Sequence, residues 1–261
     1  MKSLAIGATG MLAQQLNVET ISNNIANSTT TGFKRQRAEF QDLLYQSLRR
    51  IGSSTSDAGT IVPSGIQVGA GVRPIGVYRI NEQGNITITD NKLDVALNGR
   101  GYFQIELPSG ETAYSRAGSF QLSPEGTVVT PDGYTVKPGL KIPSEATDIT
   151  VSPTGMVQAK LAGEVKPKDV GQLEITIFAN DAGLEAIGSN LLLQTPASGD
   201  PVSGKPGDPG YGRVIQGSLE TSNVNVVQEI TTLITAQRAY EMNSKVIKTT
   251  DEMMQTAGQI K

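Results

Sequence analysis

The chain of 261 residues carries a net charge of −3 and contains neither cysteine nor histidine. Without cysteine it can form no disulfide or thiolate metal site, and without histidine it lacks the commonest general base and metal ligand. The balanced charge predicts no nucleic-acid binding, and no apolar run approaches the roughly 18 residues that a membrane span needs. We therefore expect no cofactor, no metal site and, because no continuous apolar stretch follows Lys2, no cleaved signal peptide.

An apolar heptad repeat predicts a helix over residues 1–27, with no proline to interrupt it. The apolar residues on this repeat or beside it include Leu4, Met11, Val18, Ile21 and Ile25. We expect the helix to stop near Asn27, because residues 28–31 are poor helix formers and Gly32 can adopt a positive φ.

A motif of asparagines and small residues, followed by a turn, marks the end of this helix. It comprises Asn24, Ile25, Ala26, Asn27, Gly32 and Phe33. The motif resembles the N-terminal signature of the bacterial flagellar rod and hook proteins. Asparagine also caps helices and turns the chain, so a local structural role is compatible with the same residues.

Apolar residues at three- and four-residue spacing predict a second, short helix over residues 35–50. They are Phe40, Leu43, Leu44, Leu48 and Ile51. The family resemblance implies an export-gate motif, in which a phenylalanine is followed four residues later by an apolar residue. Phe40 and Leu44 fit this pattern, although any amphipathic helix offers such a pair.

Residues 52–71 are rich in glycine, serine and threonine, which predicts an irregular or extended segment. Taken alone, this composition indicates a linker. Residues 45–65, however, resemble the insertion that separates distal rod members of the family from hook members. The resemblance implies that this segment packs against neighbouring subunits and makes the assembled tube straight and stiff. The residues expected to make the contact are Ile61, Val62, Pro63, Ile66 and Val68.

From about residue 72 to residue 178 the apolar period changes to two, which predicts short β-strands. Turn signals such as Pro131-Asp132-Gly133 and Pro153-Thr154-Gly155 separate them, and indicate an antiparallel β domain. The runs at residues 93–103 and 114–118 again resemble the rod and hook proteins.

A second heptad repeat predicts a long helix over residues 223–261. Its main positions are Val226, Ile230, Leu233, Tyr240, Ile247 and Met254. The residues Gln237, Arg238, Ala239 and Tyr240 complete a run that resembles the C-terminal end of the same family. Two matches in the right order, one near each terminus, make the resemblance specific.

A heptad helix at each end of the chain predicts that the two ends pair. One shared seam of about ten apolar side chains is too little to offset the entropy of ordering about sixty residues. We therefore expect the termini to be loose in the monomer and to become ordered against other copies. The predicted fold is α+β, with terminal helices paired as a coiled-coil-like tube domain around a central antiparallel β domain.

Four segments follow from this interpretation, with an extended connecting segment between the first helix and the β domain. They are residues 1–34 and 220–261 for the tube domain, 35–71 for the short helix and connecting segment, and 72–219 for the β domain. The resemblance implies a structural subunit of the distal rod, a hollow drive shaft that crosses the periplasm, transmits torque and passes exported subunits. It also implies self-assembly, and contacts with proximal rod proteins, the hook, outer ring proteins and the type III export apparatus.

Two alternatives remain open. Within the family, the chain could be a hook or proximal rod protein. In another class, it could be an enzyme acting on cell-wall glycan, because two carboxylate pairs have the residue types for glycosidase chemistry. These pairs, Asp90 with Asp94 and Glu106 with Glu111, lie at turn or strand signals, where solvated carboxylates are ordinary.

Overall fold

The computed structural model describes residues 2–49, 64–161 and 166–259. The chain forms two compact units, here named the helical unit and the β unit. The helical unit comprises Met1–Ile25, Gln36–Tyr78 and Val226–Lys261, and the β unit comprises Ala26–Arg35 and Arg79–Asn225. Both ends of the chain therefore belong to the same unit.

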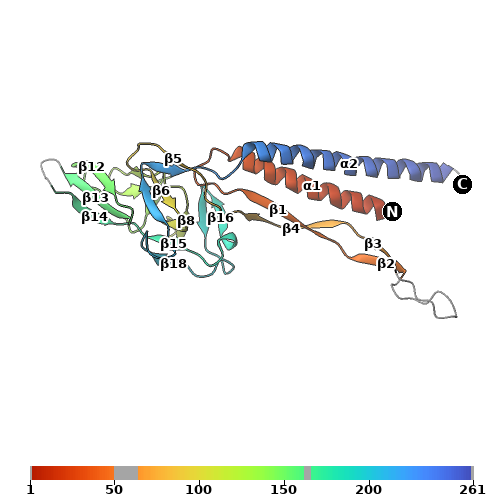
Figure 1. Cartoon of the computed structure of the whole chain (residues 1–261), viewed down its shortest axis with the longest axis horizontal. Helices are drawn as coiled ribbons and strands as arrows, with labels where there is room; N and C mark the ends of the chain where they lie inside the picture. The colour runs from red at the N-terminus through yellow and green to blue at the C-terminus, as the bar shows by residue number, and fades with distance from the viewer. Residues whose placement is uncertain (1, 50–63, 162–165, 260–261) are drawn as a thin grey trace. The chain divides into compact units, whose positions relative to one another are not determined.

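Two long helices and two short β ribbons make up the helical unit (Figure 1). Its elements are α1 (Lys2–Ala26), β1 (Gln36–Asp42), β2 (Tyr45–Arg49), β3 (Ile66–Gly69), β4 (Val72–Arg79) and α2 (Val226–Gln259). Strand β1 pairs with β4, and β2 pairs with β3. Helix α1 contacts both the β1–β4 ribbon and α2, since Thr9 Oγ1 accepts a hydrogen bond from the Val72 N–H at 3.3 Å and Asn24 bonds to Glu229.

Two glycines allow α1 and α2 to approach closely. A Cβ atom placed on Gly10 would lie 2.8 Å from Asn243 Nδ2, and one placed on Gly7 would lie 2.9 Å from Ile247 Cγ1. Both distances are shorter than normal van der Waals contact, so any side chain at these positions forces its neighbour to move.

This contact engages only part of the predicted heptad seam. On α2, Leu233 and Ile247 are half-buried, whereas the buried residues are Glu229 and Ala236. The remaining predicted α2 positions are exposed: Val226, Ile230, Tyr240 and Met254. On α1, Ile21 is buried, and the half-buried positions are Leu4, Met11, Val18 and Ile25. The α+β fold with a helix at each end is confirmed, while coiled-coil pairing stays a prediction.

The predicted helix over residues 35–50 is wrong, because this segment forms strands β1 and β2. Strand β1 alternates half-buried and exposed residues from Gln36 to Phe40, so a period of two competes with the three- and four-residue spacing. Strand β2 takes its hydrogen-bond partners from β3, with Tyr45 opposite Gly69 and Arg49 opposite Ile66. Cross-strand pairing with a distant segment therefore overrides the local apolar pattern.

The β unit contains the remaining strands and one short 3₁₀ helix (Figure 1). Its first elements are β5 (Ile86–Ile88), β6 (Val95–Asn98), β7 (Tyr102–Glu106), β8 (Thr112–Ser115), β9 (Gln121–Leu122), β10 (Val128–Val129) and β11 (Thr135–Val136). The next are β12 (Ala146–Val151), β13 (Met156–Leu161), β14 (Lys168–Gln172), β15 (Ile175–Ile177) and η1 (Asp181–Gly183). The last are β16 (Glu185–Gly188), β17 (Leu191–Leu193), β18 (Val202–Gly204), β19 (Arg213–Gln216) and β20 (Ser218–Glu220).

A nine-stranded sheet organises this unit. Its main path runs β16-β17-β8-β7-β11-β10-β9, and β15 joins β7 to β18. Smaller sheets combine β12-β13-β14, β19 with β6, and β20 with β5. The pairings with an assigned register are antiparallel, as the alternating pattern predicts.

The core of the β unit comes from the inward faces of these strands. Its large, fully buried apolar side chains include Leu97, Phe103, Ile105, Val136, Ile175 and Phe178. Burying such side chains is worth roughly 1.5–3 kcal/mol each, so this unit has a core of its own. It thereby fixes the backbone around residues 98–101 and 116, where the polar junction described next is formed.

Candidate junction site and assembly surfaces

A buried carboxylate, that of Glu220, lies at the end of β20 and is only 1% exposed. Its Oε1 accepts hydrogen bonds from Lys34 Nζ at 2.6 Å and from the Gly84 N–H at 2.9 Å. Its Oε2 accepts a hydrogen bond from Arg116 Nε at 2.6 Å. One buried anion thus has two buried cationic partners, and we name Lys34, Arg116 and Glu220 the junction triad.

Lys34 reaches Glu220 because the segment that follows α1 turns sharply at Gly32. Gly32 has φ of 69° and donates its N–H to the Glu220 carbonyl at 2.8 Å. A Cβ atom there would lie 2.8 Å from the Ala117 nitrogen and 2.9 Å from the Arg116 carbonyl carbon. Since both contacts are with backbone, which cannot swing away, only glycine fits this position.

Asn223 ties the same segment to the stretch that precedes α2. Its Oδ1 accepts a hydrogen bond from the Arg35 N–H at 2.7 Å. Its Nδ2 donates to the carbonyls of Ile80 at 2.9 Å and Glu82 at 3.0 Å. One asparagine therefore joins three backbone segments at the point where the chain enters and leaves the β unit.

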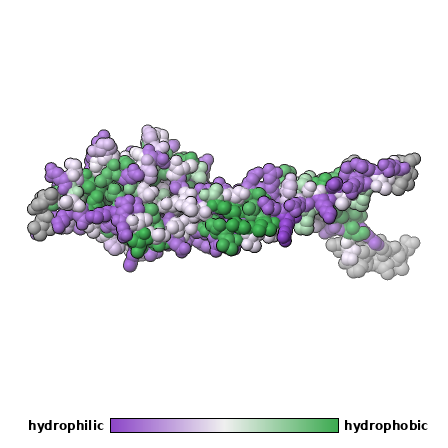
Figure 2. Space-filling view, turned by 90° about the horizontal axis from the view of Figure 1, so that it is seen from above, coloured by the Kyte–Doolittle hydropathy of each residue, from purple (hydrophilic) through white to green (hydrophobic). Residues whose placement is uncertain are grey.

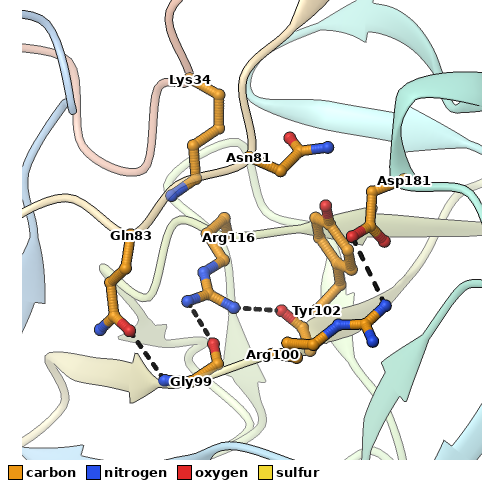
Figure 3. A pocket seen from close by; sticks show the side chains of 9 residues that line it. Lys34, Asn81, Gln83, Gly99, Arg100, Tyr102, Arg116 and Asp181 are labelled. Carbon is orange, nitrogen blue, oxygen red and sulfur yellow. Dashed lines mark hydrogen bonds and ion pairs between the residues drawn. The ribbon is translucent and has the colours of Figure 1, made fainter.

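Arg116 holds the tight turn between β6 and β7 (Figure 3). Its guanidinium donates to the carbonyls of Gly101 at 2.5 Å, Gly99 at 2.6 Å and Leu97 at 3.3 Å. Glu220 takes a further N–H, so four of the five guanidinium donors have an acceptor. This explains how a guanidinium that is only 8% exposed is stabilised.

The electrostatics of the triad follow from its burial. Burial alone would raise the pKa of Glu220, but Arg116, Lys34 and the Gly84 N–H together hold it below its ordinary value. Burial lowers the pKa of Lys34, and the pairing with Glu220 opposes that change. The carboxylate form of Glu220 is thus favoured in the folded chain, and the triad is held together by ion pairs.

A pocket of about 180 Å³ opens beside the triad. Figure 3 shows Lys34 and Arg116 on one side of it and Arg100, Tyr102 and Asp181 on the other. Burial raises the pKa of Asp181, although Arg100 and Arg116 oppose it, and burial also raises the pKa of the Tyr102 hydroxyl. Most residues that line the pocket have polar side chains, and its triad cations are already engaged by Glu220 and by backbone carbonyls.

The described residues offer no cluster of three or more histidine, cysteine, aspartate or glutamate side chains able to hold a metal ion. None of the helices in the described part of the chain is long and apolar enough to cross a membrane.

Three regions of the chain match models of known protein families. The N-terminal region, residues 4–34, matches the model described as flagella basal body rod protein. Residues 96–159 match the flagellar hook protein FlgE/F/G D1 domain, and residues 215–260 match the flagellar basal body rod FlgEFG protein C-terminal region. These matches include all three members of the junction triad.

Full-length relatives decide the assignment. The chain is 59% identical to the flagellar basal-body rod protein FlgG of Caulobacter vibrioides over 261 residues, which is 100% of both chains. The chain belongs to the flagellar basal-body rod protein family. The FlgG protein of Agrobacterium fabrum is 56% identical over 97% of both chains. That of Bacillus subtilis is 39% identical over 98% of this chain and 97% of its own.

As a member of this rod family, the chain is a structural subunit of the flagellar distal rod. It is located in the flagellar basal body and assembles with other flagellar rod and hook proteins. Members of the family are structural proteins, so the alternative of a glycan-acting enzyme is wrong. One of the carboxylates considered for that chemistry has a local structural role, because Asp94 accepts hydrogen bonds from Thr89 and Asn91.

The family-motif residues fall in both units. Asn24 is 1% exposed, donates to the Gln36 carbonyl at 2.8 Å and to Glu229 Oε2 at 3.1 Å, and accepts from the Gln36 N–H at 2.8 Å. It therefore holds α1 to both β1 and α2. In the β unit, Gly32 belongs to the junction. The other motif positions are Ile25, Ala26, Asn27 and Phe33, with exposed Gln237, Arg238 and Tyr240 and half-buried Ala239 on α2.

Of the residues predicted to stiffen the rod, only some lie within the described part of the chain, and their role stays a prediction. Ile61, Val62 and Pro63 lie outside the described residues. Ile66 and Val68 lie on β3, where Ile66 is exposed and Val68 half-buried.

Neither residue of the suggested export-gate motif lies on a helix. Phe40 is half-buried on β1, and Leu44 lies just after that strand and is 87% exposed. Their role stays a prediction.

The junction triad was not identified from the sequence. Lys34 and Arg116 stand inside runs that resemble the family, but Glu220 has no local signal, and it is 186 positions from Lys34. An ion pair between residues so far apart in the sequence can be identified only once the fold positions their strands.

Proposed function

We propose that this rod subunit assembles helically with copies of itself into a rigid hollow shaft, with α1 and α2 lining the inner tube. The shaft transmits torque from motor to hook, and its lumen passes exported subunits. The β unit forms the outer layer. In this proposal residues 1–34 and 220–261 form the coiled-coil-like tube domain, residues 35–71 connect it, and residues 72–219 form the outer domain.

The observation that carries the proposal is the exposed apolar surface of α2. This helix has 34 residues, about 51 Å at 1.5 Å per residue, yet buries only Glu229 and Ala236. Figure 2 shows hydrophobic residues gathered over the beginning of α2, where Val227, Ile230 and Ile234 are exposed. A long helix with an uncovered apolar stripe is stabilised by packing against another surface, and further copies of the chain supply it.

The β2–β3 ribbon offers a second apolar surface in the same unit. Its exposed large side chains include Tyr45, Leu48 and Ile66, with Leu44 at its base. We infer that this ribbon, which carries Val68, and the segment between its two strands, which carries Ile61, Val62 and Pro63, contact neighbouring subunits and limit bending of the shaft.

The position of such a shaft in the flagellum implies further partners. The proposal includes proximal rod proteins below it, the hook above it, and outer ring proteins that surround it as a bushing. It crosses the periplasm after export by the flagellar type III apparatus, without a cleaved signal peptide, and Phe40 with Leu44 is the export-gate motif.

A matched pair of substitutions on α2 tests the assembly surface. Ile234→Asp places a charge on the apolar stripe, whereas Thr235→Asp places the same charge on the exposed polar position next to it. In electron micrographs of concentrated protein, wild type and Thr235→Asp should form straight tubes. Ile234→Asp should form none, or should need at least a tenfold higher concentration. Equal assembly of both variants, or no tubes from wild type at any concentration, would refute the proposal.

A further inference from the structure

The pocket beside the junction triad is large enough for a small ligand and has no assigned role. Its volume is about 180 Å³, and a water molecule occupies about 30 Å³ in the liquid, so it holds about six waters. That space suits a small carboxylic acid or the carboxylate side chain of an aspartate or glutamate. All of its lining residues belong to the β unit, which has its own core.

Several hydrogen-bond donors of the pocket are not used by the described chain. Tyr102 is 5% exposed and lines the pocket. No fully buried polar side-chain atom of the described residues lacks a partner, so its hydroxyl, which bonds to none of those residues, is open to the pocket. The side-chain amide of Asn81 also has no hydrogen-bond partner among them. Arg100 donates one N–H to the Phe178 carbonyl at 3.1 Å and forms a long ion pair with Asp181 at 3.9 Å, and its 63% exposed side chain keeps further N–H groups accessible. Figure 3 shows the Tyr102 ring lying between Arg116 and Asp181.

The charge balance favours an anion. Three cationic side chains, those of Lys34, Arg100 and Arg116, face two carboxylates, those of Asp181 and Glu220, which leaves one positive charge uncompensated. Glu220 is fully occupied by Lys34, Arg116 and the Gly84 N–H. A guanidinium next to a phenol and an amide presents donors suited to a carboxylate, whose two oxygens only accept.

We propose that this pocket binds a short carboxylate through Arg100, Tyr102 and Asn81, and that in the assembled rod an aspartate or glutamate side chain of a second copy supplies it. Only the source of the carboxylate rests on the proposed function. Binding itself is a property of the β unit. Asp181 stands at the wall of the pocket and repels the ligand, so its charge sets an upper limit on affinity.

A titration of the dilute full-length chain with succinate tests the pocket. Binding is followed by the backbone amide NMR signals of Gly101 and Tyr102, and sodium chloride serves as the ionic-strength control. Wild type should bind saturably. Tyr102→Phe should bind about 3- to 10-fold more weakly and Arg100→Gln at least about tenfold more weakly, as expected for losing a neutral and a charged hydrogen bond. Asp181→Asn should bind more tightly.

The control is Lys160→Gln, which removes one exposed positive charge from β13 and should bind succinate like wild type. Each variant is first checked for an unchanged melting transition. If wild type shows no saturable shift, or Arg100→Gln and Tyr102→Phe bind like wild type, the proposed pocket is wrong.

A second measurement distinguishes the two sources of the carboxylate. If a neighbouring copy supplies it, succinate should raise the concentration needed for tube formation by wild type, and should have no such effect on Arg100→Gln. If succinate binds the monomer but leaves assembly unchanged, the ligand is a free small acid and the neighbour's role is refuted. If tubes never form, the proposed function fails, while the monomer titration still decides the pocket.

Discussion

At the scale of single residues, the most consequential feature is a carboxylate, Glu220, buried between two cations. Removing water from three charged groups is costly, and the geometry offsets this cost only because nearly every donor and acceptor is used. Such a site does not by itself add much stability compared with an apolar core. It makes the arrangement specific, since a strand or turn shifted by one residue leaves a buried charge without a partner.

Neutralising Glu220 should therefore destabilise the β unit strongly. Glu220→Gln leaves Lys34 and Arg116 buried without an anion, and we expect the free energy of unfolding to fall by about 3–5 kcal/mol. Urea unfolding followed by tyrosine fluorescence measures this. The matched control is Asp148→Asn, which breaks the exposed pair with Lys92 and should change stability far less. Similar losses in both variants would contradict the assigned role of the triad.

The ion pairs of Glu220 also predict that the free energy of unfolding depends on pH. The pKa of Glu220 is lowered in the folded chain, because Arg116, Lys34 and the Gly84 N–H outweigh the effect of burial. The unfolded chain therefore binds the proton first, and the stability that Glu220 contributes is complete above its ordinary pKa of 4.5 and lost as pH falls through the folded value. The difference in unfolding free energy between wild type and Glu220→Gln should narrow below pH 4.5. A constant difference down to acid pH would contradict this.

At the scale of elements, Asn24 connects α1 to its two neighbours. Its side chain pairs with both backbone groups of Gln36 on β1 and with Glu229 on α2. A buried polar residue at a helix interface specifies register, since no shifted pairing restores the same bonds.

Asn24→Ala should release β1 from α1 in the assembled rod. The Gln36 amide loses its side-chain acceptor, at a cost of about 1–3 kcal/mol, so its hydrogen exchange should be roughly 5- to 150-fold faster. Ser22→Ala, at an exposed position of α1, serves as the control and should exchange like wild type at Gln36. Unchanged protection of Gln36 in Asn24→Ala would show that the ribbon does not depend on this contact.

The elements also show which parts of the fold were predictable. The terminal helices follow from uninterrupted heptads, and the strands of the β unit follow from a period of two between turn signals such as Pro131-Asp132-Gly133. The β1 and β2 strands were missed because their partners, β4 and β3, lie beyond a segment rich in glycine, serine and threonine, so local spacing favoured a helix. Glu220 was missed for the same reason, since its partners come from distant strands.

At the scale of the whole molecule, the chain contains two kinds of structure. The β unit has a buried core and the buried ion pairs of the junction triad. The helical unit has long helices with exposed apolar residues, among them Val227 at 76% and Met253 at 63% exposure. We propose that the terminal helices become fully stable only when other copies cover those residues.

Amide hydrogen exchange on the dilute monomer and on assembled tubes tests this central claim most directly. The account predicts that amides of α1 and α2 exchange rapidly in the monomer and become protected on assembly, whereas β7 and β15 are protected in both. Full protection of both terminal helices in a strictly monomeric sample would contradict it.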